Sequence, residues 1–539
     1  MEALTTEFRV TGPPGTGKTT FLARQVESDV ARYGEERIVI ASLTRAAAAE
    51  IGARVDLPRQ QVGTLHSLCF HLLGKPELTE KHLKEWNESH PDDVLSTEKT
   101  GSIDEPDADA RGETGETEAD RLRGRYDLYR AREYPREFWP SDVEYFAGIW
   151  EDWKRREYLM DFTDLIVQAG AYEHAPGAPS VLMVDECQDQ SKIEMRLIRQ
   201  WGQHVERLYV VGDPDQAIFT WRGADPSVFQ YPPAPAERRR VLSQSYRVPE
   251  AVHAQAMEWI RQIDDRDDVR YEPRPAPGFV EHSRATFKRP EEVADQIEEC
   301  IVAGASAMAL ASCGYMLYPL IKVLRDRAIP FHNPYRRING RWNPLSRSSE
   351  RKTGLVDRLL AFLRPDPQVW GESAREWNAH DLKLWAHLLR AEGVFLRGAK
   401  TQVAALEDRQ RLTSEMLAGW FEPEALLALW RLSVPWFADH MLTKPRETAE
   451  YTLCVLEERG AVALMEPPKV TVGTIHSVKG GQSDVVFLFP DLSQQGAENY
   501  HTPGDGFDAV VRLFYVALTR AHEGVVHCAP SGFGAAVNW

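Results

Sequence analysis

The chain has 539 residues, of which 43% are hydrophobic, 27% are charged and 15 are tryptophan. This composition excludes a mostly disordered chain, a collagen-like chain and a small disulfide-bonded scaffold, and the length predicts about three or four domains. The net charge of −17 argues against a protein coated in basic surface, although a local basic groove can lie on an acidic body.

Short apolar runs that end in turn or phosphate-binding residues predict the strands, and helical stretches separate most of them. This alternation predicts an α/β fold with two parallel-sheet cores that carry helices on both faces, each interrupted by an insertion. The predicted strands, in chain order, are 8–11, 37–43, 181–184, 208–211, 307–311, 470–473, 484–489 and 524–528.

The first predicted insertion, about 76–160, contains a strongly acidic stretch and then an arginine-rich one. Between Ser89 and Asp120 there are eleven acids and two bases with few apolar residues, a composition that predicts a disordered acidic loop. The arginines that follow are either a solvated helix face or a phosphate-contacting helix that the acidic loop can mask. They are Arg121, Arg123, Arg125, Arg130, Arg132 and Arg136.

The second predicted insertion, about 341–465, holds seven of the 15 tryptophans, interleaved with leucine and alanine at helical spacing. This pattern predicts a plain helical core. The six cysteines are scattered without a CxxC pair, which predicts reduced, buried thiols of a cytoplasmic protein. No apolar run approaches the ~20 residues of a membrane span, and the motif that begins at Gly12 leaves no room for a cleaved signal.

A glycine-rich segment after the first strand fits the pattern G-x-x-x-x-G-K-[ST], in the strand-to-helix context that a phosphate-binding loop requires. Its glycines let backbone N–H groups close on the β-phosphate at a helix N-terminus. Lys18 is expected between the β- and γ-phosphates, and Thr19 is expected to supply an oxygen to Mg²⁺. The motif predicts a nucleoside triphosphate site formed by Gly12, Pro13, Pro14, Gly15, Thr16, Gly17, Lys18, Thr19 and Thr20.

Two adjacent carboxylates follow the apolar run 181–184, which is the arrangement of a Walker B motif. Asp185 would hold Mg²⁺ through water, and Glu186 would accept a proton from the attacking water. Adjacent acids after a strand are common in general, but the phosphate-binding loop upstream favours the catalytic interpretation.

Further motifs follow in the order found in superfamily-one helicases of the UvrD/Rep/PcrA type, which the chain resembles. Residues 211–224, VGDPDQAIFTWRGA, resemble the "GDxDQSIYxWRGA" signature of that family, and residues 185–189 extend the carboxylates to D-E-x-Q-D. Shorter matches are 64–69 to "TFHSLC", 161–166 to "FDDLL", 245–247 to "NYRS", 328–331 to "GIPY", 474–480 to "TIHSAKG" and 512–521 to "RLxYVAxTRA". The matches cover the two predicted sheet cores and leave the insertions uncovered.

The resemblance implies that the nucleotide, ATP with Mg²⁺, lies between two RecA-like lobes. Arg247 and Arg520 then correspond to arginine fingers that neutralise charge on the γ-phosphoryl group, with Arg520 placed only when the lobes close. Gln188 and Gln216 correspond to sensors of the γ-phosphate. Tyr246 corresponds to the aromatic ring that stacks on the nucleobase.

The resemblance also implies that single-stranded nucleic acid crosses both lobes. Trp221 is the best stacking candidate, because a planar ring holds any base without reading sequence, although a core tryptophan is the alternative. Five further residues are expected to contact backbone phosphates or to couple them to the ATP site, with an ordinary structural role as the alternative for the histidines. They are Thr64, His66, Arg222, Thr474 and His476.

The chain departs from the family at several positions. Leu43 stands where the family has a stacking phenylalanine, and Arg45 restores a cation one position early. Gln482 replaces a glutamate thought to meet the ribose, so a carboxylate becomes an amide. Only eleven residues precede Gly12, and the family's upstream adenine-reading glutamine is missing from them, which predicts weak discrimination between nucleobases.

The sequence therefore predicts two RecA-like lobes, residues 1–75 with 161–250 and residues 251–340 with 466–539, and two insertions. The predicted activity is an ATP-dependent helicase or translocase on single-stranded or forked DNA, moving 3′ to 5′ by family resemblance alone. Three alternatives stay open: a single-strand translocase that unwinds little duplex, an RNA-directed motor, and a non-catalytic ATP-gated adaptor. The last is disfavoured by the intact Lys18, Glu186, Arg247 and Arg520.

Overall fold

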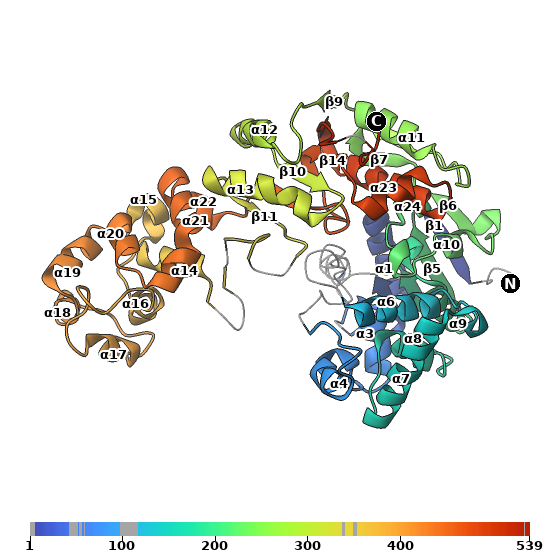
Figure 1. Cartoon of the computed structure of the whole chain (residues 1–539), viewed down its shortest axis with the longest axis horizontal. Helices are drawn as coiled ribbons and strands as arrows, with labels where there is room; N and C mark the ends of the chain where they lie inside the picture. Colours follow the sequence, from blue (N-terminus) through green and yellow to red (C-terminus); the bar gives the residue numbers. More distant parts are fainter. Residues whose placement is uncertain are drawn as a thin grey trace. The chain divides into compact units, whose positions relative to one another are not determined.

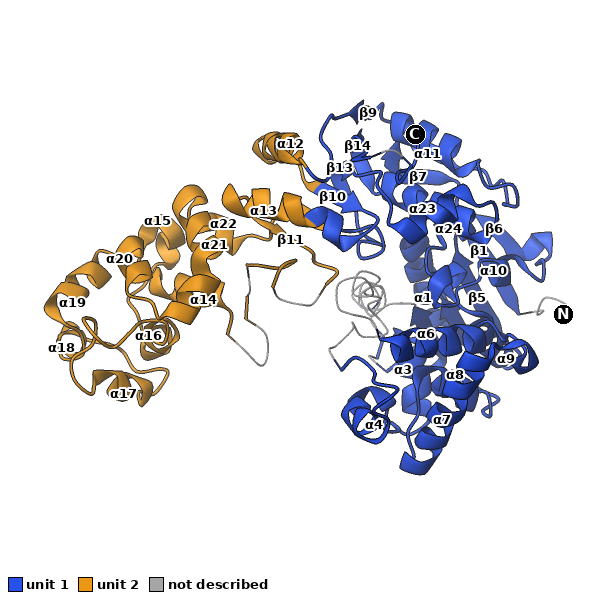
Figure 2. Cartoon of the chain, viewed as in Figure 1, with its two compact units in different colours: residues 1–288, 308–317, 473–539 blue, residues 289–307, 318–472 orange. Residues whose placement is uncertain are grey.

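The computed structural model describes residues 6–42, 52, 57–58, 60–97, 117–336, 340–345, 347–348, 353–532 and 534–539. The chain divides into two compact units (Figure 2). Unit 1 comprises Met1–Lys288, Met308–Leu317 and Gly473–Trp539, and unit 2 comprises Arg289–Ala307 and Tyr318–Val472. The core of the predicted acidic loop, 98–116, lies outside the described residues, as do Leu43 and Arg45.

The first sheet has six strands in the order β3-β2-β4-β5-β1-β6, and its neighbouring pairs are parallel. Its helices include α1 (Lys18–Tyr33), α3 (Leu65–Leu72), α8 (Phe162–Ala169), α9 (Lys192–Gly202) and α10 (Ser227–Gln230) (Figure 1). The strands are β1 (Glu7–Thr11), β2 (Ile38–Ser42), β3 (Val62–Thr64), β4 (Val181–Val184), β5 (Arg207–Gly212) and β6 (Arg239–Val241).

Both faces of this sheet are apolar because alternate residues of its central strands point to opposite faces. In β4, Val181 and Met183 join one buried cluster, whereas Leu182 and Val184 join the other. Helices in the crossover connections cover both faces. The polar residues that follow the strands gather at one edge of the sheet, because the carboxyl ends of parallel strands lie at the same edge.

The chain between β3 and β4 forms a helical insertion around an aromatic core. Its longer helices are α4 (Leu83–Ser89), α6 (Glu118–Ala131) and α7 (Ser141–Glu157). The ring of Trp86 meets that of Trp150 edge-on at 4.9 Å and that of Trp153 at 5.2 Å, and all three side chains are buried. Edge-to-face packing of this kind adds to the area that the rings bury.

The arginine-rich stretch lies on α6 and just beyond it, and the protein itself supplies partners for all six guanidinium groups. Arg130 binds Asp161 at 3.0 Å and Asp164 at 2.6 Å, and Arg136 binds Glu144 and Glu151. Arg132 donates to the carbonyl of Thr220 at 2.9 Å. Arg121, Arg123 and Arg125 pair with Glu118, Glu80 and Asp142. These contacts favour an internal ion-pair network over an array of phosphate-binding cations.

The centre of that network is buried. Asp161 is 2% exposed and caps the N-terminus of α8 in a capping box with Asp164. Lys154 on α7 contacts Asp161 and, at 2.6 Å, Asp164. Although burial by itself raises the pKa of Asp161, the charges of Arg130 and Lys154 hold that pKa well below its usual value. The charges of Arg130 and Lys154 therefore neutralise those of Asp161 and Asp164 at a place where burial limits solvation by water.

The second sheet has the strand order β11-β12-β10-β13-β14-β9, and the boundary between the units crosses β10 and β12. In unit 1, β14 is parallel to both β13 and β9, and helices α11 (Glu250–Ile260), α23 (Gln494–His501) and α24 (Asp505–Leu518) accompany them. A separate parallel pair is formed by β7 (Gln244–Pro249) and β8 (Glu272–Arg274). The six strands are β9 (Phe279–His282), β10 (Ala307–Ala311), β11 (Phe331–His332), β12 (Val470–Thr474), β13 (Ser483–Leu488) and β14 (Ala521–His527).

Unit 2 contains α12 (Glu291–Val302), α13 (Tyr318–Asp326) and a bundle of short helices. Phe362, Trp377, Trp385 and Phe437 pack ring against ring within its core, whereas Trp430 is 51% exposed. The predicted helical core is present. The helices are α14 (Leu355–Phe362), α15 (Pro367–Trp370), α16 (Ala379–Ala386), α17 (Ala399–Ala404), α18 (Ser414–Ala418), α19 (Pro423–Trp430), α20 (Val434–Asp439), α21 (Thr443–Arg459) and α22 (Val462–Met465).

The α/β class with two parallel sheets is confirmed, and each of the eight predicted strands has a counterpart. The sequence did not reveal β3, β6, β7, β8, β9 or β11, which have two to six residues and lack a continuous apolar run. All six cysteines lie in the described part of the chain and none forms a disulfide bond, but the expectation of buried thiols is wrong for the exposed Cys454 and for the partly exposed Cys300 and Cys313. None of the helices in the described part of the chain has the length and apolarity that crossing a membrane requires.

The buried ion pairs of Lys154 and Arg130 with Asp161 and Asp164 yield a prediction about the free energy of unfolding. Replacing Lys154 by Met leaves Asp161 and Asp164 with one cation fewer, and breaking a buried pair in this way costs about 3–5 kcal/mol. The matched change Lys81→Met removes an exposed ion pair with Glu77, and losing such a surface pair should change the free energy of unfolding little. Urea unfolding followed by tryptophan fluorescence should show the difference.

The same variants predict a pH dependence. Because the pKa of Asp161 is depressed in the folded state, its contribution is fully present above its ordinary value of 3.8 and declines as the pH falls below it. The gap in urea midpoint between the wild type and Lys154→Met should therefore be constant at neutral pH and narrow in acid. Equal midpoints for the Lys154 and Lys81 variants at pH 7 would contradict the assignment.

Candidate active site

The phosphate-binding loop joins β1 to α1 and is tightly enclosed. Gly15 and Gly17 have φ angles of 75° and 81°, in the region that glycine adopts without strain, and Gly17 caps α1. A Cβ at Gly15 would lie 2.6 Å from Cβ of Arg247, so β7 leaves no room for a side chain there. The carbonyl of Gly15 accepts from the amide of Tyr246 at 2.8 Å. The loop is thus shaped by the strand that carries Tyr246 and Arg247.

Lys18 occupies the first turn of α1, and its ammonium donates to the carbonyl of Gly12 at 2.7 Å. A Cβ on Gly12 would lie 2.5 Å from Cγ of Lys18, so glycine at position 12 lets the lysine stem lie across the loop. Thr16 closes the loop by donating to the carbonyl of Pro13 at 2.8 Å. Thr19 and Thr20 follow on the same helix turn.

Asp185 and Glu186 end β4 at the same edge of the sheet. Asp185 is buried and accepts from the amide of Glu186 at 3.0 Å, and Glu186 has a φ of 55°. Burial raises the pKa of Glu186, but the positive charges of Lys18 and Lys479 outweigh it and lower that pKa below its usual value. The carboxylate therefore stays ionised at neutral pH, as a group that orients water must be.

The two predicted sensors are linked to a third acid, Asp213, at the end of β5. Gln188 accepts from the amide of Asp213 at 2.9 Å, and Gln216 donates to its carboxylate at 2.7 Å. Burial, and then the neighbouring Asp215, raise the pKa of Asp213 to about 7. Asp215 in turn is held by Arg266 at 2.7 Å. Sequence reasoning named Gln188 and Gln216 but gave these acids no role, although they lie within the quoted 211–224 motif.

Two of the predicted arginines meet predicted glutamines within unit 1. Arg520 is buried and donates to Oε1 of Gln216 at 2.9 Å, while Gly481 and Val516 accept further bonds from its guanidinium group. Arg247 donates to Gln482 at 2.9 Å. The structure thus brings together four of the predicted residues in two pairs. Tyr246 is 69% exposed, which leaves its ring face accessible.

Lys479 is the residue that sequence reasoning missed. Its ammonium contacts Asp189, donates to the carbonyl of Gln216 at 2.6 Å and lies 4.0 Å from Glu186. Burial raises the pKa of Asp189 to about 6 even with this cation beside it. The signal was present, because Lys479 lies in the 474–480 motif, but the motif does not say which acids the lysine would meet.

The donor set at the loop fits Mg²⁺. That ion prefers oxygen ligands and is typically held by one or two carboxylates, substrate phosphates and water. Asp185, which follows β4, is a buried carboxylate, and Thr19 carries a hydroxyl group in the first turn of α1. Among the described residues no group of three or more histidines, cysteines or acids is placed to hold a metal ion.

Trp221 lies in a short 3₁₀ turn, Thr220–Arg222, and is partly exposed. Its ring meets His476 edge-on at 6.4 Å and Phe219 at 6.4 Å, and the ammonium of Lys479 lies 5.1 Å from the centre of the Phe219 ring. Burial lowers the pKa of His476 to about 4, so this ring is neutral at pH 7. Arg222 is partly buried in the same turn. A continuous set of contacts therefore runs from Trp221 to the acids around Lys479.

The turn that carries Trp221 is braced by α6. Arg132, at the end of that helix, donates to the carbonyl of Thr220 at 2.9 Å. A Cβ on Gly223, whose φ is 102°, would lie 2.6 Å from Cβ of Ala131. The insertion thus touches the turn at two points, a contact that no sequence motif signalled.

The remaining predicted residues have structural partners. Thr64 caps α3 by accepting from the amide of Ser67 at 3.1 Å, and Thr474 accepts from Ser477 at 3.3 Å in the corresponding place after β12. Both threonines are buried. His66 is partly exposed, with Nδ1 3.7 Å from a carboxylate oxygen of Glu194. Contacts of these residues with nucleic acid stay predictions.

Residues 1–233 match the sequence model of the family described as the UvrD/REP helicase N-terminal domain. The chain is 26% identical over 280 residues to the ATP-dependent DNA helicase PcrA of Staphylococcus epidermidis, which covers 47% of this chain and 37% of that protein. It is 25% identical over 397 residues to DNA helicase II of Haemophilus influenzae, which covers 65% of this chain and 51% of that protein.

The chain therefore matches about half or less of the length of these relatives. The matched family region contains the phosphate-binding loop, Asp185, Glu186, Gln188, Gln216 and Trp221, whose geometry is described above. The comparisons confirm the resemblance to UvrD/Rep/PcrA-type superfamily-one helicases, and the match to the N-terminal domain of that family spans residues 1–233, which is less than half of the chain.

Proposed function

We propose that this protein is a DNA-stimulated ATPase that moves along single-stranded DNA and separates duplex DNA, as a helicase. The observation that carries the proposal is the meeting of Arg520 and Lys479 with Gln216 and Asp189 beside the phosphate-binding loop. Lys479 and Arg520 come from segments next to the second sheet, and they contact Asp189 and Gln216, which follow strands of the first sheet. A motor driven by ATP hydrolysis needs cations placed in this way to neutralise charge on the γ-phosphate. The names of the relatives support ATP and DNA as substrates.

In this proposal the chain's own residues divide the chemistry. Backbone amides of the loop and Lys18 bind the phosphates, Glu186 orients the attacking water and accepts its proton, and Arg520 and Arg247 neutralise charge on the transferring group. Thr19 and Asp185 would hold Mg²⁺, which supplies charge neutralisation between the β- and γ-phosphates when bound. Tyr246 would stack on the base and Gln482 would face the sugar.

Strand binding would reach this chemistry through the Trp221 turn. A base stacked on Trp221 would press on Phe219 and His476, and Phe219 lies beneath the ammonium of Lys479. Because Lys479 also contacts Asp189 and Gln216, movement of the turn would change the field at the sensors. This continuity supports coupling between strand and nucleotide.

Direction, 3′ to 5′, rests on family resemblance. A translocase with little unwinding and an RNA-directed motor are the alternatives. Two experiments distinguish the helicase, the translocase and the RNA-directed motor. One compares the ATPase rate with single-stranded DNA and with RNA of the same sequence, and the other measures strand separation of a forked duplex. An ATPase rate that only RNA stimulates would contradict the proposal and favour an RNA-directed motor. DNA-stimulated ATPase without strand separation would restrict the activity to translocation.

The Walker B assignment predicts the effect of Glu186→Gln. This variant should bind Mg·ATP with near wild-type affinity and hydrolyse it at least ~100-fold more slowly, because a positioned base contributes about 10²–10⁴ in rate. The control Glu88→Gln changes an exposed glutamate on α4 and should leave hydrolysis unchanged. Single-turnover hydrolysis measures the step. Near-normal turnover by Glu186→Gln would contradict the assignment.

The stacking role predicts that Trp221→Ala weakens single-stranded DNA binding and the stimulation of ATPase, with basal ATPase kept. Base stacking is worth about 1–3 kcal/mol, which corresponds to about 5- to 150-fold in affinity. Trp430→Ala removes an exposed tryptophan of unit 2 and serves as control. Fluorescence anisotropy with labelled oligo(dT) gives the affinity. Unchanged affinity with a sharply lower melting temperature would make Trp221 a core residue.

The brace on the turn predicts a smaller effect of the same kind. Arg132→Gln loses the bond to the carbonyl of Thr220, so the Trp221 turn is held less firmly and DNA affinity should fall about fivefold, which corresponds to about 1 kcal/mol. Arg136→Gln removes the same charge. It breaks the pairs with the exposed Glu144 and the partly exposed Glu151 and the contact with the Trp139 ring, and because none of these partners belongs to the Trp221 turn, DNA affinity should change little. Equal losses in both variants would indicate a general charge effect and no brace.

A further inference from the structure

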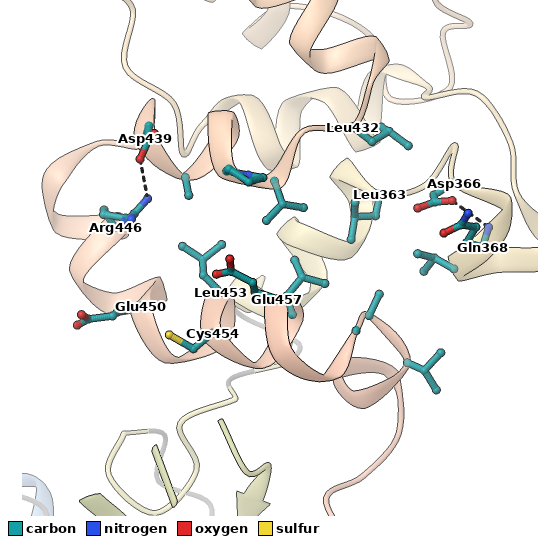
Figure 3. Close-up of a pocket in the computed structure, with 18 of the residues that line it drawn as sticks. Leu363, Asp366, Gln368, Leu432, Asp439, Arg446, Glu450, Leu453, Cys454 and Glu457 are labelled. Carbon is teal, nitrogen blue, oxygen red and sulfur yellow. Dashed lines mark hydrogen bonds and ion pairs between the residues drawn. The ribbon is translucent and has the colours of Figure 1, made fainter. Parts of the chain in front are cut away.

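Unit 2 contains a cavity of about 850 Å³ that the proposed motor function does not use (Figure 3). It lies between α21, α20 and α15, with the chain after α14 and the start of α22 completing its wall. Its apolar lining includes Leu363, Leu453, Leu456 and Ala438, which are nearly buried, and the partly exposed Val434. The cavity therefore offers an apolar floor that is open to a ligand.

The rim of this cavity is acidic. Asp366, Asp439, Glu447, Glu450 and Glu457 line it, against one cation, Arg446. That guanidinium group lies 3.7 Å from the carboxylate of Asp439. No cation in the described part of the chain lies within 4 Å of the carboxylates of Glu447, Glu450 and Glu457, which are exposed.

A thiol lies within this acidic cavity. Cys454 lies on α21 between Glu450 and Glu457 and is exposed (Figure 3). Partial burial, then the charges of Glu450, Glu457 and Glu458, raise the pKa of this thiol, and Arg446 opposes them only in part. The net field at the cavity is negative, which would repel the phosphates of a nucleic acid.

The spacing of the acids matches a helical ligand. Glu450 and Glu457 are seven residues apart on α21, which is two turns, or about 10.5 Å along the helix. Leu453 and Leu456 lie between them in sequence and line the same cavity. A helix laid into such a groove presents apolar anchors at i, i+3 or i+4 and i+7, and cations two turns apart on its edge would meet the two glutamates.

We propose that this groove docks an amphipathic, lysine- or arginine-rich helix of a partner protein. The apolar face of that helix fills the space over Leu363, Leu453 and Leu456, and its cations pair with Glu450 and Glu457. The site lies within unit 2 and is independent of the nucleotide chemistry proposed for unit 1.

The test uses the full chain and a fluorescein-labelled synthetic peptide of about 14 residues, roughly four helical turns, with leucines on one face and lysines on the other. Anisotropy titration should give saturable binding that weakens with salt. The double variant Glu450→Lys with Glu457→Lys should bind at least about tenfold more weakly, because like charges then face the peptide. The control, Glu392→Lys with Glu415→Lys, makes the same charge change at exposed acids outside the groove and should bind as the wild type does.

Two further measurements locate the peptide and define what it recognises. A second peptide with serine for every leucine keeps the charge and should bind at least about tenfold more weakly, because the apolar anchors are lost. Saturating Leu/Lys peptide should slow alkylation of the exposed Cys454 by a maleimide, with Cys454→Ser as the blank.

Several results would overturn the proposal. The first is equal affinity of the Leu/Lys peptide for the wild type and for the groove variant, Glu450→Lys with Glu457→Lys. The second is equal affinity of the wild type for the serine peptide and the Leu/Lys peptide. The third is alkylation of Cys454 that the Leu/Lys peptide does not slow. Slower alkylation of Cys454 in the presence of oligo(dT) would assign the groove to nucleic acid and overturn the proposal. ATPase of the groove variant should match that of its control, which shows that unit 1 is intact.

Discussion

Lys479 and Arg520 carry positive charge from the second sheet to buried acids and amides at the edge of the first. Asp185, Glu186, Asp189 and Asp213 crowd the ends of β4 and β5, and burial alone would drive protons onto several of them. The lysines and arginines around them, together with hydrogen bonds from Gln188 and Gln216, favour the ionised form of these acids. Charge compensation therefore links segments of unit 1 that are distant in sequence, and a triphosphate added there would compete with the acids for the same cations.

For this competition to occur, the lysine side chains must be able to move from the acids to the phosphates while the acids stay in place. The acids follow strands whose side chains pack on both sheet faces, so their positions are fixed by the core. Lys18 and Lys479 reach the site on long stems, and each rests on a backbone carbonyl, that of Gly12 or Gln216. A carbonyl is a weaker partner than a phosphate, so these contacts are the ones that a nucleotide would replace.

Much of this could be predicted from the sequence, because strands buried on both faces are continuous apolar runs and because phosphate chemistry demands particular residues at particular spacings. The central strands and the loop from Gly12 to Thr19 followed from those constraints alone. Short strands such as β6, Arg239–Val241, carry exposed polar residues and are defined only by their neighbour β1. The partners of Arg121 to Arg136, and the acids that meet Lys479, come from distant segments, so no local pattern could identify them.

The close approach of Ala131 to Gly223 has a consequence for how relatives of this chain can diverge. Position 223 needs a residue without a side chain because of both its backbone angle and its neighbour, and position 131 must stay small as long as α6 ends there. Variation at the two positions should therefore be correlated across homologues. Exposed parts of the insertion are free to change in length and charge, provided that Arg130 and Lys154 still pair with Asp161 and Asp164 and that the end of α6 still reaches the Trp221 turn with a small residue.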